Sequence, residues 1–159
     1  MKIKYLLMAV IVATMTACGT SSKVPLTGRT HRISISDEQL LALSNQEYAK
    51  FMASATKSTD AKNTAMVQRV GRRLANAVET YLRSNGYASE VKNFRWEFNL
   101  IKNNQANAFC MPGGKIVVYT GLLNLVGNGG HSDDELAAVM GHELSHALAK
   151  HANERISNQ

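Results

Sequence analysis

Two stretches in the first half of the chain repeat apolar residues at helical spacing. The first opens at Ser36-Asp37-Glu38, a typical helix start, and its apolar positions are Leu40, Leu41, Leu43, Tyr48, Phe51 and Met52. The second extends from about Asp60 to Ser84 and stops at Asn85-Gly86. The helix face opposite its apolar positions carries most of the arginines, as expected of a solvated face: Arg69, Arg72, Arg73 and Arg83. These patterns predict two long helices.

After these helices the apolar period changes to two. Apolar and polar residues alternate from Phe94 to Leu100, which is typical of a half-buried strand. A polar turn at 102–105 is followed by an extended segment at 106–111, a Pro-Gly-Gly turn and a β-branched strand at 115–120. Because the connections look too short for parallel crossovers, we expect a small antiparallel sheet.

The last periodic segment begins at Ser132, which has the spacing of a capping box with Glu135. A short apolar helix at 121–126 and a glycine-rich loop at 127–130 precede it. Its core-facing positions are Leu136, Val139, Met140 and Leu144. Helices combined with a small sheet predict an α+β fold, and residues 31–159 have the length of one domain.

The N-terminus has the pattern of an export signal. A basic head precedes an apolar run from Tyr5 to Ala13 that is too short to span a bilayer comfortably. The sequence that ends at Cys18 resembles a bacterial lipobox, in which the signal is cut before a cysteine that is then lipidated. We therefore expect a signal peptide at 1–17, lipidation at Cys18 and a flexible tether at 18–30. The alternative is an ordinary signal peptide with an incidental cysteine.

Such an anchor places the protein on the periplasmic side of the bacterial cell envelope, without choosing between inner and outer membrane. The formal charge of +6 becomes +4 when Lys2 and Lys4 leave with the signal. No run of Lys and Arg with interleaved aromatic residues is present, so nucleic acid is a poor candidate partner. The second cysteine, Cys110, stands between two apolar residues, and we expect a buried thiol rather than a disulfide framework.

The segment from His142 to His146 reads H-E-x-x-H inside the last predicted helix. One turn of helix is about 3.6 residues, so the two histidines project from the same face. Two imidazoles at this spacing can bind one zinc ion, and Glu143 can act as the general base of a metalloprotease. The alternative is a surface helix with scattered histidines.

Two longer stretches, 107–123 and 134–146, closely resemble the M48 zinc metallopeptidases, a family of gluzincins that includes bacterial envelope lipoproteins. The resemblance implies a zincin-like fold and one Zn²⁺ per chain, bound by His142 and His146. It implies that Glu143 is the catalytic base. It also implies protein or peptide substrates and proteolytic quality control in the envelope.

The resemblance further indicates where a substrate would lie. In the family, the Asn-Ala-Phe segment and the strand after the Pro-Gly-Gly turn border the cleft. By analogy with other zincins, an extended substrate would pair with an edge strand there. We therefore expect Asn107, Ala108 and Phe109 near the substrate.

The sequence departs from the family at the third metal ligand. In the family a glutamate on a later helix completes the site, and a catalytic zinc needs three protein ligands, whereas thirteen residues follow His146 here. On a straight helix His151 and Glu154 lie about 180° and 120° around from His142, so neither faces the histidine pair. Lys150 and the basic residues after it are expected to form the polar end of this helix.

The domain at 31–159 is therefore expected to be incomplete at its C-terminus. The leading interpretation is a zinc metalloendopeptidase of the cell envelope that is anchored by lipid. A second interpretation belongs to another class: a non-catalytic envelope lipoprotein that retains an incomplete zinc site and acts as a binding or scaffold module. Zinc stoichiometry separates the two.

Overall fold

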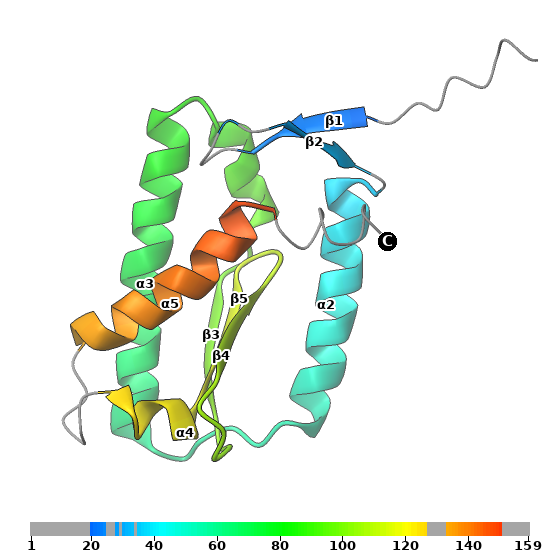
Figure 1. The fold of residues 1–159 in the computed structure, drawn as a ribbon. Helices are drawn as coiled ribbons and strands as arrows, with labels where there is room; N and C mark the ends of the chain where they lie inside the picture. Colours follow the sequence, from blue (N-terminus) through cyan, green and yellow to red (C-terminus); the bar gives the residue numbers. More distant parts are fainter. Residues whose placement is uncertain (1–19, 25–27, 29, 34, 127–132, 151–159) are drawn as a thin grey trace, which may run out of the picture.

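The computed structural model of the chain describes residues 20–24, 28, 30–33, 35–126 and 133–150 (Figure 1). In chain order its elements are β1 (Thr20–Lys23), β2 (Thr30–Ile33), α2 (Asp37–Ser54), α3 (Ala61–Ser84), the 3₁₀ helix η2 (Ala88–Asn93), β3 (Glu97–Ile101), β4 (Ala108–Met111), β5 (Lys115–Tyr119), α4 (Thr120–Leu123) and α5 (Asp133–Leu148). This mixture of helices and a small sheet confirms the predicted α+β class.

The helices α2 and α3 form where the apolar periodicity predicts them. Ser36 begins α2 with a capping box: its hydroxyl accepts from the Gln39 N–H at 3.2 Å, and the Gln39 side chain accepts from the Ser36 N–H at 3.0 Å. Asp60 begins α3 by accepting from the Asn63 N–H at 2.9 Å. Gly86, in the left-handed conformation, follows the end of α3.

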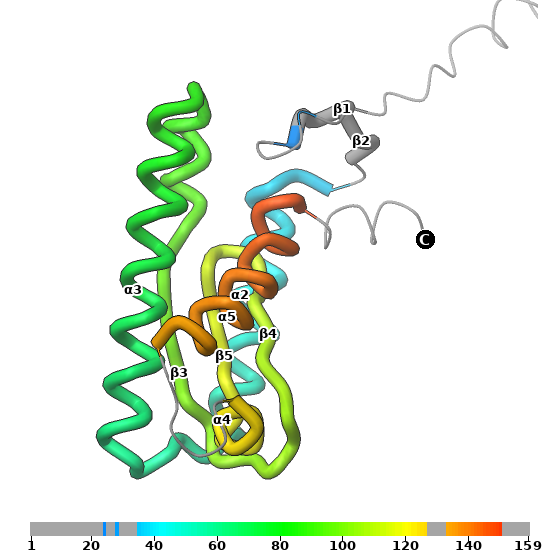
Figure 2. Tube along the Cα trace, turned by 60° about the vertical axis from the view of Figure 1, so that its left-hand side comes forward, coloured from blue at the N-terminus to red at the C-terminus, as the bar shows by residue number. Residues whose placement is uncertain are grey.

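The three-stranded sheet lies between α2 on one face and α3 with α5 on the other (Figures 1 and 2). Strand alternation produces this division, because Ile116 and Val118 point into the core with α3 and α5 while Val117 and Tyr119 point towards α2. The larger core includes Val67, Val70, Leu82, Leu136, Met140 and Leu144. Every residue of β5 is buried, as expected of the central strand.

The strand order is β3-β5-β4, which corrects the predicted all-antiparallel sheet. β4 and β5 form the expected antiparallel hairpin, but β3 pairs with β5 in parallel, with Phe98 opposite Ile116. The prediction was wrong because it treated neighbours in sequence as neighbours in the sheet. Residues 102–114, which include β4 itself, form a crossover of about a dozen residues, long enough for a parallel pair.

Part of the predicted tether has regular structure. β1 pairs antiparallel with β2, and Val24 is fully buried. The predicted tether therefore includes the strand at residues 20–23, which pairs with residues 30–33. The expected signal peptide, the expected lipidation site Cys18 and the expected helix cap Ser132 lie outside the described residues. Within the described part of the chain, no helix combines the length and apolar character that crossing a membrane requires.

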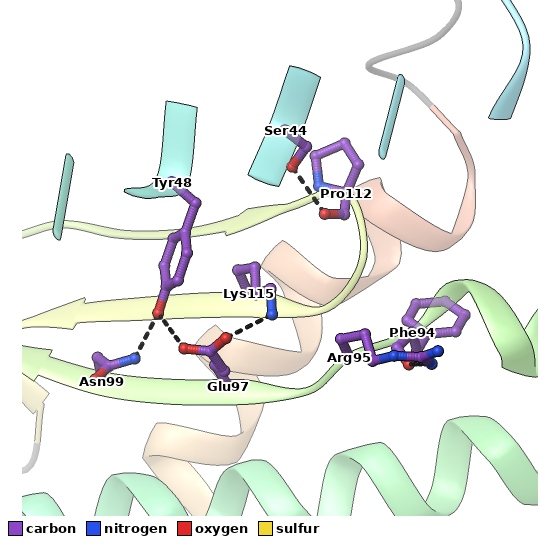
Figure 3. Close-up of polar contacts among 8 residues, drawn as sticks. All are labelled: Ser44, Tyr48, Phe94, Arg95, Glu97, Asn99, Pro112 and Lys115. Atoms are coloured by element: carbon purple, nitrogen blue, oxygen red, sulfur yellow. Dashed lines mark hydrogen bonds and ion pairs between the residues drawn. The ribbon is translucent and has the colours of Figure 1, made fainter. Parts of the chain in front are cut away.

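A polar cluster joins α2 to the sheet (Figure 3). The Tyr48 hydroxyl on α2 donates to Oε2 of Glu97 at 3.0 Å and accepts from the Asn99 amide at 2.7 Å. The Lys115 ammonium donates to Oε1 of Glu97 at 2.6 Å and lies 5.6 Å from the centre of the Tyr48 ring. Tyr48 and Lys115 are both buried. Their hydrogen bonds offset the cost of burying polar groups and link the helix to β3 and β5.

Candidate metal centre and adjoining cavity

Helix α5 presents two histidines on the side opposite its buried stripe. The stripe repeats every four residues and consists of Leu136, Met140, Leu144 and Leu148. His142 and His146 also lie four residues apart, and both are exposed. Arg69 of α3 donates two hydrogen bonds, of 2.8 and 2.6 Å, to the Asp133 carboxylate in the first turn of α5. This bidentate contact anchors the start of the helix.

The two imidazoles have the separation of metal ligands. Nε2 of His142 and Nε2 of His146 are 3.2 Å apart, and the ring planes meet at 84°. A tetrahedral zinc with Zn–N bonds of about 2.0–2.1 Å requires ligating nitrogens about 3.3 Å apart. The pair therefore fits two positions of such a site. The same separation also suits a hydrogen bond between the rings, with one nitrogen carrying the hydrogen.

A third ligand is not placed beside this pair within the described residues. Across that part of the chain, no group of three or more His, Cys, Asp or Glu side chains could hold a metal ion. His151 and Glu154, the nearby candidates in the sequence, lie outside it. A catalytic zinc site needs three protein ligands, so the described structure contains candidates for two of them.

A cavity of about 420 Å³ reaches His146, one of the two histidines. Glu143 and His146 of α5 line it, together with Phe109 and Cys110 of β4, and the first turns of α2 contribute to its lining. Burial of the Cys110 thiol, reinforced by the negative charge of Glu143, raises the pKa of the thiol to about 12. The thiol is therefore neutral at ordinary pH, and Cys110 is half-buried where the sequence predicts a buried residue.

The three residues predicted to lie near the substrate, Asn107, Ala108 and Phe109, have different surroundings. Phe109 lines the cavity and packs edge-on against Phe51 of α2, with ring centroids 5.4 Å apart. Ala108 is buried in the core shared with α5. Asn107 is exposed, and its carbonyl accepts from the Tyr119 N–H at 3.0 Å. Of the three residues, Phe109 alone belongs to the cavity lining.

The end of α5 differs from the expected polar helix terminus. The helix stops at Leu148, and Lys150 adopts the left-handed conformation with φ of 55°, which is uncommon for a residue with a side chain. Its ammonium donates to Oδ2 of Asp37 in α2 at 2.8 Å and lies 3.3 Å from Oε2 of Glu90 in η2. The sequence predicts Lys150 as part of a polar helix end, but it does not reveal these two partners, because they are remote in sequence and no local pattern specifies them.

Lys150, Asp37 and Glu90 all contribute to the lining of the cavity. Burial by itself lowers the pKa of the Lys150 ammonium, but the hydrogen bond to Asp37 and the negative charge of Glu90 outweigh burial and raise the pKa. Lys150 is therefore positively charged where it meets the two carboxylates.

The sequence model of peptidase family M48 matches residues 61–159, which include the whole sheet, α5 and both histidines. The match covers more than half of the chain, and the chain belongs to this family. The resemblance read from the two motif stretches is thereby confirmed. Membership supports a metalloprotease function and implies a divalent metal ion.

Curated relatives agree with this family. The chain is 29% identical to the mitochondrial metalloendopeptidase OMA1 of Bos taurus over 135 residues, 84% of this chain and 24% of the relative. It is 46% identical to the Arabidopsis thaliana OMA1 over 69 residues, 43% of this chain and 13% of the relative. The beta-barrel assembly-enhancing protease of Escherichia coli is 26% identical over 165 residues, 99% of this chain and 31% of the relative. The chain thus spans less than a third of the length of these relatives.

Proposed function

We propose that this protein is a zinc-dependent metalloendopeptidase that cleaves peptide bonds in cell-envelope proteins, as part of proteolytic quality control. The observation that carries the proposal is the 3.2 Å separation of Nε2 of His142 and Nε2 of His146, beside a cavity lined by Glu143. Membership of a metallopeptidase family supports the reaction. A bacterial relative named for beta-barrel assembly supports the cell envelope as the place of action.

In the proposed reaction, His142 and His146 hold the metal and Glu143 moves the proton. A bound Zn²⁺ supplies Lewis acidity towards water and the scissile carbonyl. Glu143 is half-buried at the cavity, where it accepts the proton of the attacking water and then delivers it to the leaving amine. Both histidines lie on the exposed face of α5. A segment bearing the third ligand can reach that face without displacing the core.

The free edge of β4 is the proposed place for an extended substrate. Within the described residues β4 pairs only with β5. In an antiparallel pair, residues whose backbone groups bond to the partner strand alternate with residues whose backbone groups point away from it. Asn107 bonds to Tyr119, the last residue of β5, so Ala108 and Cys110 direct their backbone N–H and C=O groups away from β5, towards the free edge. A peptide added at this edge would pair with them by β-augmentation. Phe109, on the cavity, would then contact a substrate side chain.

The proposed location is the periplasmic side of a bacterial membrane. The export signal at 1–17 and the lipobox-like sequence before Cys18 support an anchor by lipid at that cysteine. The β1–β2 hairpin would then lie between the membrane and the metallopeptidase domain.

The test of the reaction is Glu143→Gln, which keeps the size of the side chain but removes the base. We expect zinc binding to persist and cleavage of an unfolded protein substrate to fall by about 10²–10⁴-fold, the usual contribution of a general base. Glu135→Gln, in the exposed first turn of the same helix, is the matched control and should cleave like the wild type. Equal cleavage by Glu143→Gln and the wild type would refute the role of Glu143.

A second candidate function is a non-catalytic scaffold with an incomplete zinc site, favoured by the lack of a third ligand among the described residues. Zinc titration separates the candidates. One tightly bound zinc per chain, lost in His142→Ala and His146→Ala, supports the enzyme. Micromolar or weaker binding, unchanged when any sequence encoded after Gln159 is included, supports the scaffold.

A further inference from the structure

We propose that Lys150 is a positioning residue, which holds the metal-binding helix over the cavity through its ion pairs with Asp37 and Glu90. The inference rests on the proposed metal site at His142 and His146. It adds a residue that the two motif stretches do not contain and that acts through α5 rather than on the substrate.

The geometry links three elements that are remote in sequence. Lys150 follows His146 by four residues, lies two residues beyond the end of α5, and lines the same cavity. Its ammonium contacts Asp37, 113 residues earlier at the start of α2, and Glu90, 60 residues earlier in η2. The segment directly after α5 is thereby joined to both elements beside the cavity.

The burial of this cluster distinguishes it from an ordinary surface ion pair. The side chain of Lys150 is 11% exposed and that of Asp37 is 28% exposed, whereas the surface pair Lys50–Glu47 on α2 is about three-fifths exposed at both partners. Exposed pairs contribute little, but removing one partner of a buried group leaves the other charge uncompensated. The ion pairs also account for a lysine in a backbone conformation that favours glycine.

Two polar anchors, one near each end of α5, then supplement the packing of its buried stripe. Arg69 holds Asp133 in the first turn, and Lys150 holds the opposite end. His142, Glu143 and His146 lie between these anchors. Helix ends fray when they are not tied down, so loss of the second anchor loosens the turn that carries His146.

The most direct test changes α2 and leaves α5 untouched. Asp37→Asn removes the charge that Lys150 contacts, and Glu38→Gln removes the neighbouring charge in the same first turn of α2, where the side chain is exposed. We expect Asp37→Asn to weaken Zn²⁺ binding by about tenfold, the size of effect seen for residues that orient metal ligands. It should also speed alkylation of Cys110 by iodoacetamide several-fold in the metal-free protein, because the cavity opens. Glu38→Gln should change neither.

Substitutions at Lys150 separate charge from backbone conformation. Lys150→Arg keeps the charge and should retain wild-type zinc affinity and Cys110 reactivity. Lys150→Gly suits the left-handed backbone but removes the charge, and it should behave like Asp37→Asn. Circular dichroism and the thermal midpoint establish that each variant is folded at the temperature of measurement.

Two results would overturn the positioning role. One is Asp37→Asn matching Glu38→Gln in both readouts; the other is Lys150→Gly matching the wild type. If the wild-type protein binds no zinc even when any sequence encoded after Gln159 is included, the proposed function fails, and the alkylation rate of Cys110 alone decides whether Lys150 holds α5. The two hypotheses therefore fail by different measurements.

Discussion

At the residue scale, two glycines on facing helices differ in what surrounds them. A Cβ atom at Gly71 of α3 would overlap the Phe98 ring, so the close approach of α3 to β3 requires glycine. A Cβ at Gly141 of α5 would meet Cδ2 of Leu74 at 3.9 Å, an ordinary contact. The structure therefore does not require glycine at 141 for helix packing, although the residue precedes His142.

The same substitution should have opposite effects at these two positions. Gly71→Ala should destabilise the protein by about 1–3 kcal/mol because it overpacks the core. Gly141→Ala should stabilise it by up to about 1 kcal/mol because alanine favours a helix. Urea unfolding of both variants checks the pair. Destabilisation by Gly141→Ala would show that α3 and α5 approach more closely than the 3.9 Å contact implies.

At the element scale, the attachment of α2 to the sheet depends on a titratable group. The hydrogen bond from Lys115 is the largest cause that lowers the pKa of Glu97 below its usual 4.5, with a further contribution from Tyr48. The pKa of Tyr48 is in turn raised by burial and by Glu97. A carboxyl whose pKa is lowered on folding stabilises the protein above its unfolded pKa, and this contribution is lost as the pH falls through the folded pKa.

We therefore expect stability to decline as the pH falls below about 4.5 and to do so less steeply in Glu97→Gln. The Glu97 side chain is half exposed, so the difference should be modest. Unfolding by urea between neutral and about pH 3 measures the slope. Tyr48→Phe should cost about 1 kcal/mol at neutral pH through the lost hydroxyl contacts. Identical pH profiles for Glu97→Gln and the wild type would contradict the proposed linkage.

Local rules predicted the helices of this protein better than its sheet. Capping at Ser36 and Asp60 depends on residues three positions apart, so the sequence shows it directly. The parallel pairing of β3 with β5 could not be read in that way. Alternation along a strand indicates which residues share a face, but it does not identify the neighbouring strand.

At the scale of the whole molecule, the predicted anchor depends on Cys18. Cys18→Ala should abolish incorporation of a labelled fatty acid in a bacterial host and leave a precursor that retains residues 1–17. Cys110→Ala removes the other cysteine and should be lipidated normally. Mass spectrometry of the purified protein measures both outcomes. Persistent labelling of Cys18→Ala would mean that this cysteine is not the lipidation site.

By itself the sequence determined the α+β class, the two long helices and the H-E-x-x-H helix that carries His142, Glu143 and His146. These features depend on short-range periodicity, capping and motif spacing. The residues that determine each of them lie close together in the sequence. Only the tertiary structure decided the strand order, the cavity beside Glu143 and the ion pairs of Lys150. Each of these arises from contacts between distant parts of the chain, and a local pattern does not specify which distant residue will be its partner.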